Sequence, residues 1–383
     1  MLRRFLLMLL ALALLASAAL GEGWVVEDED DGIVPDRPAQ AQLLLQRMTL
    51  EEKIWQLLMV TPEALTGDAI TQYLWTGNVF SARPVGGVVI FGQNIVSEDQ
   101  LRDLTSALQL QAGQAGKYPL FIAVSEEGGA WSRVANKLGY PMAASAVEAG
   151  KTKDDSLAYA AGESIARYLK PLGINLDFAP VCDVQTAEDA WIRERVYGKD
   201  AQKVSGRALQ MARGLRDNGV TPCFSHFPGQ GSVNGNLNNR EVVNTRTLEQ
   251  MRAVDWIPFR DAIADGAGMI MVSNAPSRAA GDGTAACLSA VVISRWLREE
   301  LGYQGVVITD SLRMGAITTL YKPGRAAVDA VQAGADMILL SANPDAAAAS
   351  LLKAVQNGEI SEARIDQSVA RVLALKIDSG LIR

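Results

Sequence analysis

The side chains that could do chemistry in this sequence lie at the ends of short apolar runs. Asp310 follows the run 305–309, and His226, the single histidine among 383 residues, lies inside the run 222–227. A carboxylate at a rigid strand end can act as a nucleophile. His226 has serine and phenylalanine as neighbours and no candidate metal ligands beside it, so contact with a ligand or with a loop is favoured over metal binding.

Further polar groups follow other apolar runs. Glu126 and Glu127 precede a Gly-Gly turn. Trp131 and Trp191 are predicted on nearby loops, where they would either stack on a ligand ring or pack against the rim. The strand bodies stay apolar while their ends are polar, as on a catalytic or binding face; the segments are 125–129, Asp183, 225–229, Asn274 and Asp310.

The elements that must position these groups alternate along the chain. Short apolar runs, typical of parallel strands covered on both faces, are separated by amphipathic helical stretches. Eight such units predict an α/β protein with a single (β/α)8 barrel of TIM type. A doubly wound open sheet is the alternative, disfavoured because no G-x-G-x-x-G follows an early strand. The first run is also compatible with a helix; the runs are 54–60, 85–91, 120–124, 174–180, 222–227, 268–273, 305–309 and 336–340.

Composition limits the classes of function. Hydrophobic residues make up 49% and charged residues 21%, which excludes intrinsic disorder, and the net charge is −7. A nucleic-acid partner is not expected, because such proteins need a basic surface. The three cysteines lack C-x-x-C spacing and lie in apolar surroundings, so they are predicted to be buried free thiols.

The N-terminal segment resembles an export signal. Residues 1–21 carry Arg3 and Arg4, then an apolar stretch, then a small-residue cleavage site at 16–18. We expect an exported, periplasmic or extracellular protein, anchored in the membrane if the signal is left uncleaved. A hydrophilic spacer is predicted over 22–38 and the barrel over 39–383, with no second domain.

Six segments, in order along the chain, resemble motifs of glycoside hydrolase family 3, and in particular its single-domain β-N-acetylglucosaminidases. One is similar to the family's "VDQEGG" segment, another to "KHFPGHG", and a third to the nucleophile strand "LGFxGVVxSDDLxM". The segments are 86–91, 123–129 with Arg133, 173–181, 194–198, 225–231 and 301–314.

The resemblance implies a retaining double displacement with Asp310 as nucleophile. The family's acid/base is a histidine in a D-x-H pair on a mobile loop, and the matching positions here are Asn236 and Asn238. An amide can hydrogen-bond a leaving group but cannot protonate it. General acid–base help of about 10²–10⁴-fold would then be missing for an unactivated leaving group.

The resemblance also implies a set of sugar-binding residues, some of them substituted. Ser125 replaces an aspartate and Ser225 a lysine, while Gln230 and Asn274 replace histidines. The Ser125 hydroxyl can still hydrogen-bond a sugar hydroxyl but loses the charge-assisted bond of an aspartate. The predicted substrate-binding residues are Ser125, Arg133, Arg195, Ser225 and His226.

Three functions remain open at this stage. The protein is an inactive homologue that binds a glycan or muropeptide, a hydrolase with a relocated acid/base, or an enzyme for an activated or charged substrate or another acceptor. The candidates for a relocated acid/base are Glu126, Glu127 and Asp183. The family implies β-linked N-acetylglucosamine as ligand, with cell-wall peptidoglycan as its expected source, and no metal or organic cofactor. A monomer is expected.

Overall fold

The computed structural model describes residues 37–67 and 79–382. Within them, eight strands pair in the order β7-β6-β5-β4-β3-β2-β1-β8, and every neighbouring pair is parallel. A parallel bridge between Ile308 and Met337 joins the two end strands and closes the sheet. The fold is therefore the predicted (β/α)8 barrel, and the open-sheet alternative is excluded.

All eight predicted runs overlap a strand. Seven strands are shorter than their runs, whereas β5 begins one residue before its run, at Thr221. The first run is divided, because 50–56 form a helix and only the following residues form a strand. That helix begins at a capping box, in which Thr49 and Glu52 each accept from the other's backbone N–H. The strands are β1 Leu58–Val60, β2 Gly87–Val89, β3 Phe121–Val124, β4 Leu176–Asp177, β5 Thr221–Phe227, β6 Met269–Val272, β7 Val306–Thr309 and β8 Ile338–Leu339.

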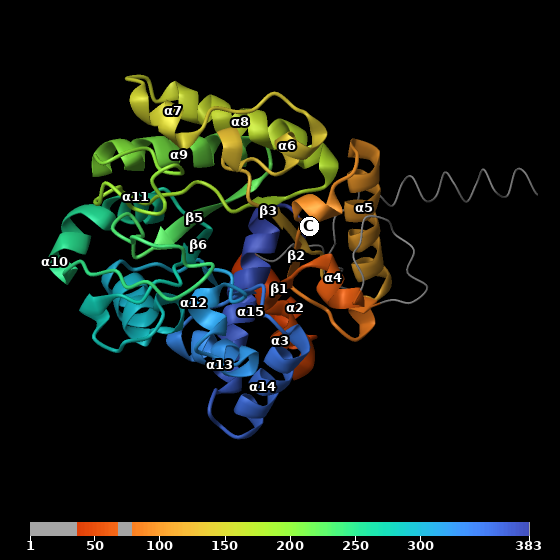
Figure 1. The fold of residues 1–383 in the computed structure, drawn as a ribbon. Helices are drawn as coiled ribbons and strands as arrows, with labels where there is room; N and C mark the ends of the chain where they lie inside the picture. Colours follow the sequence, from red (N-terminus) through yellow and green to blue (C-terminus); the bar gives the residue numbers. More distant parts are fainter. Residues whose placement is uncertain (1–36, 68–78, 383) are drawn as a thin grey trace, which may run out of the picture.

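Helices surround the strands on all sides (Figure 1). Several start at side-chain caps that the sequence contains, such as Ser97, Asp200 and Ser361. The α-helices are α2 Arg37–Gln46, α3 Leu50–Gln56, α4 Pro62–Thr66, α5 Glu98–Gln114, α6 Val134–Leu138, α7 Ala146–Lys151, α8 Ser156–Leu169, α9 Ala201–Asp217, α10 Leu248–Gln250, α11 Ile257–Ala264, α12 Gly315–Thr318, α13 Pro323–Ala333, α14 Pro344–Gln356 and α15 Glu362–Asp378.

Two predicted helices have a wider turn than expected. The stretch 248–265 divides into α10, the π-helical η5 Met251–Asp255 and α11, and the stretch 289–301 contains the π-helical η8 Val291–Glu300. Short 3₁₀ turns complete the connections: η1 Val79–Ser81, η2 Gly92–Asn94, η3 Gly129–Trp131, η4 Lys170–Leu172, η6 Arg278–Ala280 and η7 Ala286–Leu288.

The apolar residues form two main layers because strand side chains alternate in direction. Phe121 and Ala123 of β3 belong to the cluster inside the barrel, together with Met269 of β6. Ile122 and Val124 of the same strand belong to the larger layer between barrel and helices. Cys182, Cys223 and Cys287 are buried and unbridged, as predicted.

A buried carboxylate fixes the closure of the barrel. Asp336, just before β8, accepts from the backbone N–H of Val307 in β7 (2.9 Å) and from Ser368 of α15 (2.7 Å). Arg298 and Arg371 also pair with it. Because breaking a buried, paired charge costs about 3–5 kcal/mol, this cluster holds β7 and β8 in register.

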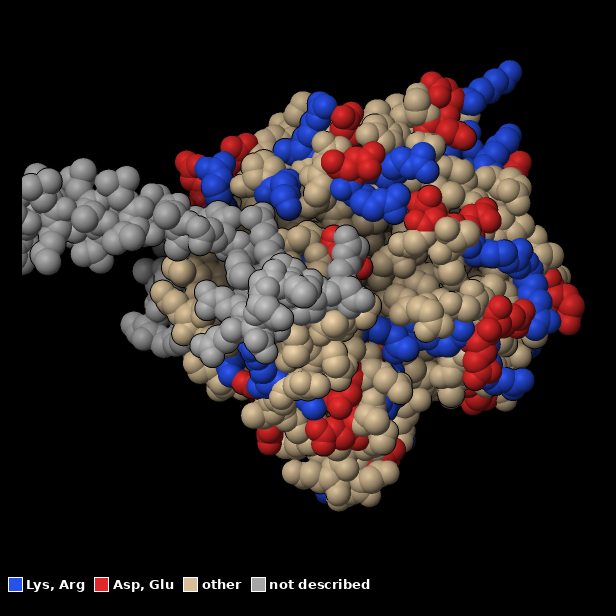
Figure 2. Space-filling view, turned by 180° about the vertical axis from the view of Figure 1, so that it is seen from behind, with Lys and Arg blue, Asp and Glu red and all other residues tan. Residues whose placement is uncertain are grey.

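The two ends of the described chain pack together, α15 against α2. The first described helix, α2, starts at Arg37, two residues before the predicted start of the barrel. The predicted signal and most of the predicted spacer lie outside the described residues. From Arg37 onward, leaving out 68–78, no helix has both the length and the apolar character of a membrane span. Figure 2 shows positive and negative side chains interspersed over one face rather than gathered by sign.

Candidate active site

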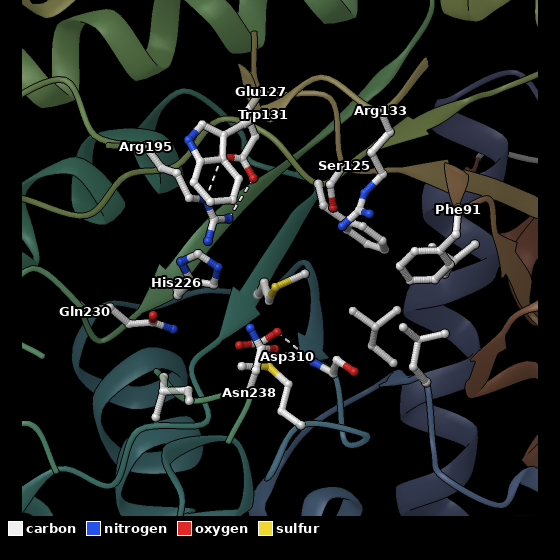
Figure 3. A pocket seen from close by; sticks show the side chains of 18 of the residues that line it. Phe91, Ser125, Glu127, Trp131, Arg133, Arg195, His226, Gln230, Asn238 and Asp310 are labelled. Atoms are coloured by element: carbon white, nitrogen blue, oxygen red, sulfur yellow. Dashed lines mark hydrogen bonds and ion pairs between the residues drawn. The ribbon is translucent and has the colours of Figure 1, made fainter. Parts of the chain in front are cut away.

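A cavity of about 380 Å³ opens at the carboxyl ends of the strands, which is the size of a small-ligand pocket. Figure 3 shows its side chains converging on a common space. Aromatic and aliphatic groups form much of the wall, with a few charged groups between them. The lining residues are Val89, Phe91, Ser125, Glu127, Ala130, Trp131, Ser132, Arg133, Phe178, Trp191, Arg195, His226, Gln230, Leu237, Asn238, Met271, Asp310, Ser311, Met314, Leu339 and Leu340.

Asp310 lines this cavity at the end of β7, whose four residues are all buried. Its backbone N–H donates to the Val272 carbonyl of β6 (2.8 Å), so the residue is fixed by the sheet. Its Oδ1 accepts from the Ser311 N–H (2.7 Å), while no described residue donates to Oδ2. Burial raises the pKa of Asp310, and the nearby His226 acts in the opposite direction. The carboxylate is rigid, with one oxygen left for a ligand.

His226 and Asp183 form a buried pair beside the cavity. His226 Nδ1 lies 2.7 Å from Asp183 Oδ2, and Asp183 Oδ1 accepts from the Gln230 N–H (2.6 Å). Asp183 is fully buried and His226 is 5% exposed, yet His226 lines the cavity. An ionised carboxylate on Nδ1 selects the tautomer that carries the proton there and leaves Nε2 as the group available to a ligand.

Glu127 and Arg195 form a bidentate ion pair across the cavity wall. Arg195 Nε donates to Oε2 (2.8 Å) and Nη2 to Oε1 (2.6 Å). The guanidinium also lies 5.3 Å from the centre of the Trp131 ring (Figure 3). The chain can turn here because Gly128 adopts φ +86°, and a Cβ there would approach the Ala144 carbonyl oxygen to 2.3 Å. The charge of Glu127 is therefore already matched by Arg195.

Glu126 has a structural role. Its carboxylate is fully buried and accepts from the backbone N–H groups of residues 133, 134 and 135, at 2.5, 2.8 and 2.9 Å. Tyr168 donates a fourth bond (2.7 Å). Three of these donors are the unpaired N–H groups at the start of α6, which a carboxylate stabilises. Glu126 does not line the cavity.

Arg133 and Ser125 lie together on the side of the cavity near Phe91 (Figure 3). The Arg133 guanidinium is 4.8 Å from the centre of the Phe91 ring. Burial lowers the pKa of Arg133, with Glu127 acting against it and Arg195 with it. No carboxylate of residues 37–67 or 79–382 forms an ion pair with this side chain, in contrast to Arg195.

The loop that carries Asn236 and Asn238 is docked onto α12. The Asn238 carbonyl accepts from the Gly315 N–H (2.8 Å), and Leu237 joins a small apolar cluster with Ala316. Asn238 lines the cavity, whereas Asn236 accepts from the Asn238 backbone N–H (2.9 Å) and is not among the lining residues. The loop thus presents one amide to the cavity and uses the other to hold its own turn.

The structure brings Asp310, Ser125, Arg133, Arg195, His226 and Asn238 together around one cavity. Ser225 is 1% exposed, does not line the cavity and has no hydrogen-bond partner for its hydroxyl among the described residues. Its contact with a sugar stays a prediction. Trp131 and Trp191 both line the cavity and are about 40% exposed (41% and 42%), as stacking on a ligand requires.

Sequence reasoning missed two features of the site. It named Asp183 as a candidate acid/base but did not pair it with His226. The available signal was that Asp183 follows β4 and His226 lies near the end of the neighbouring strand β5. It also missed the apolar wall, since Phe178, Met271 and Leu339 look like ordinary core residues. From residue 37 on, outside 68–78, no three His, Cys, Asp or Glu side chains group as metal ligands would.

Comparison with known proteins identifies the family of this chain. The sequence profile of the glycosyl hydrolase family 3 N-terminal domain matches residues 49–375. The chain belongs to glycoside hydrolase family 3. A β-hexosaminidase of Nitrosospira multiformis is 32% identical over 271 residues, 69% of this chain and 75% of that protein. The β-hexosaminidase LpqI of Mycobacterium tuberculosis is 32% identical over 301 residues, 76% of each.

Solved structures agree with this family 3 membership. A glycoside hydrolase family 3 β-N-acetylglucosaminidase from Paenibacillus superimposes with a TM-score of 0.82 at 34% identity, over 87% of this chain. This chain spans 63% of the length of that structure. LpqI of M. tuberculosis superimposes with a TM-score of 0.77 at 29% identity, over 93% of this chain and 98% of LpqI.

Proposed function

We propose that this family 3 protein is a retaining glycoside hydrolase for β-linked N-acetylhexosamine, with Asp310 as its nucleophile. The observation that carries the proposal is the Asp310 carboxylate, held at the end of β7 with Oδ2 available in the cavity. The relatives named as β-hexosaminidases and a β-N-acetylglucosaminidase support the substrate class. Peptidoglycan fragments are the proposed natural source of the sugar.

The reaction proceeds in two displacements. Asp310 Oδ2 attacks the anomeric carbon, a carbon–oxygen ester bond forms, and the glycosidic bond breaks as its oxygen gains a proton. Water then attacks the same carbon, the ester bond to Asp310 breaks and restores the carboxylate, and the proton that the water loses passes to the group that protonated the leaving oxygen. Because burial raises the pKa of Asp310, its ionised, attacking form becomes dominant at a higher pH than that of an ordinary aspartate.

The leaving oxygen needs a proton donor, and the cavity offers one candidate. Asn238 cannot supply a proton, and Glu126 and Asp183 do not line the cavity. Glu127 is committed to Arg195. We infer that His226, oriented by Asp183, protonates the leaving oxygen from Nε2 in its doubly protonated form and takes a proton back from the attacking water in the second step, in the way a carboxylate-held imidazole does in other hydrolases.

The test is to trap the covalent intermediate. Since C2 of the substrate already carries the acetamido group, the slowing fluorine is placed at C5, in 5-fluoro-N-acetylglucosaminyl fluoride. Mass spectrometry should find the sugar on the peptide that contains Asp310, and Asp310→Asn should abolish the adduct. An unlabelled Asp310, together with no hydrolysis of 2,4-dinitrophenyl N-acetylglucosaminide, would refute the hydrolase.

The second candidate is a glycan-binding protein without turnover. The observation that favours it is the pair of amides at 236 and 238, of which one faces the cavity. In that case the sugar binds equally well to the native protein and to Asp310→Asn, and no aryl glycoside is cleaved. Hydrolysis of a natural disaccharide would exclude this candidate.

We also propose that the protein is exported, on the basis of residues 1–21. N-terminal sequencing of protein recovered from the cell envelope or the medium tests this. A mature start between residues 18 and 22 supports cleavage, whereas an intact Met1 in a membrane fraction indicates an anchor. An intact protein in the cytosol would contradict export.

A further inference from the structure

The two arginines in the cavity wall differ in how their charge is compensated. Arg195 is bonded by both oxygens of Glu127, so that this pair is neutral as a unit. Arg133 has no ion-pair partner between residues 79 and 382 or in 37–67; its guanidinium lies 4.8 Å from the centre of the Phe91 ring, and Glu127 acts on it only from a longer distance. The cavity wall therefore contains an exposed guanidinium that forms no direct ion pair with the described part of the chain and is open to a ligand.

Arg133 is held where a ligand can reach it. Its backbone N–H is fixed by Glu126 Oε2 (2.5 Å) at the start of α6, and its side chain extends along Phe91 toward the cavity (Figure 3). The Ser125 hydroxyl lies beside it, also in the wall. Together they offer a planar set of guanidinium donors and one neutral hydroxyl, which suits a carboxylate.

Asp310 lies on a different part of the wall from Arg133 (Figure 3). Much of the remaining lining is apolar and uncharged, including Val89, Met271 and Leu339. A ligand can therefore place its anomeric carbon at Asp310 and an acidic substituent at Arg133 without bringing two negative charges together. A hydroxyl in that place would give the guanidinium a neutral acceptor, roughly half as strong as an ionised one.

We propose that the sugar bound in this cavity carries a carboxylate, and that Arg133 is the residue that selects it. The inference rests on the proposed function only in that the cavity binds a sugar ring. The carboxylate has two possible sources: the C6 acid of a uronic acid, or an acidic ether on an N-acetylhexosamine ring, as in N-acetylmuramic acid. Both present the same group to Arg133.

Binding measurements with matched sugar pairs test the proposal without any turnover. N-acetylmuramic acid is compared with N-acetylglucosamine, and glucuronic acid with glucose, by ligand-observed NMR titration of the full chain at low and high salt. The expected result is that the acid of one pair binds about tenfold more tightly than its neutral partner, a difference that salt reduces. Which pair shows it identifies the source of the carboxylate.

Three variants complete the test. Arg133→Gln should remove the preference for the acid while leaving the neutral sugar within about threefold, and Arg133→Lys should keep part of it, since lysine retains charge but not the bidentate geometry. Arg167→Gln, at an exposed pair with Glu163, is the matched control and should change nothing. Equal binding of acid and neutral sugar in both pairs overturns the proposal, as does equal weakening of both by Arg133→Gln. Failure to trap an adduct on Asp310 leaves the acid preference in place, so the two proposals fail separately.

Discussion

Glu126→Gln distinguishes a structural carboxylate from a catalytic one. Glu126 follows Ser125 in the sequence, and it was one of the candidates for a relocated proton donor. In the structure its two oxygens accept four hydrogen bonds, three of them from backbone N–H groups at the start of α6. The substitution keeps the size of the side chain and replaces one of these oxygens by an NH₂ group.

The cost follows from counting donors. If the amide oxygen takes the place of Oε2, the N–H groups of 133 and 134 keep an acceptor but lose charge assistance, about 0.5–1 kcal/mol each. Ala135 N–H then faces an NH₂ group, and a buried unsatisfied donor costs about 1–3 kcal/mol. Tyr168 can rotate its hydroxyl to accept instead. The sum is a loss of roughly 2–5 kcal/mol, which at about 2–4 °C per kcal/mol lowers the melting temperature by several degrees or more.

The assay combines stability with turnover. Urea unfolding and thermal melting are recorded for Glu126→Gln and for Glu163→Gln, a control at an exposed pair whose loss costs at most about 1 kcal/mol. Hydrolysis of a 2,4-dinitrophenyl and of an alkyl N-acetylglucosaminide is measured well below each melting temperature. We expect Glu126→Gln to be destabilised and to change both substrates alike. A variant that melts like the native protein but loses only the alkyl substrate would identify Glu126 as the proton donor and refute this reasoning.

Three further predictions concern the proton donor, the barrel core and the loop. His226→Gln should lower kcat/KM for alkyl glycosides by about 10²–10⁴-fold while leaving 2,4-dinitrophenyl glycosides nearly unchanged, and an equal loss on both would reduce His226 to a sugar contact. Burial lowers the pKa of Lys376 to about 7, so between pH 7 and 10 the unfolded chain binds more protons than the folded chain. The free energy of unfolding, measured by urea titration, should therefore rise from pH 7 to 10. Lys376→Met should flatten this dependence on pH. A Cβ on Gly315 would lie 2.5 Å from the Asn239 carbonyl, so Gly315→Ala should displace the loop and lower kcat/KM with little change in melting temperature; unchanged kinetics would show that the docked loop is not needed.

The sequence determined the architecture and the edge on which the site lies. Short apolar runs such as 120–124 and 305–309 alternate with amphipathic helices, and this local periodicity suffices to predict parallel strands with helices around them. Because functional groups follow barrel strands, Asp310, Ser125 and His226 could be placed on one face without coordinates. The division of 50–60 into a helix and a strand could not be predicted, because the hydrophobic pattern of so short a run fits both a helix and a strand.

The tertiary structure alone decided what each polar group does there. His226 and Asp183 are 43 positions apart in the sequence but are in contact in the structure. Glu127 and Arg195 are 68 positions apart and form an ion pair. In the closed barrel Ser225 is buried away from the cavity, whereas Arg133 lines it. A sequence pattern reports which face of its own element a residue occupies, whereas hydrogen bonding and charge compensation depend on distant segments that only barrel closure brings within 3 Å.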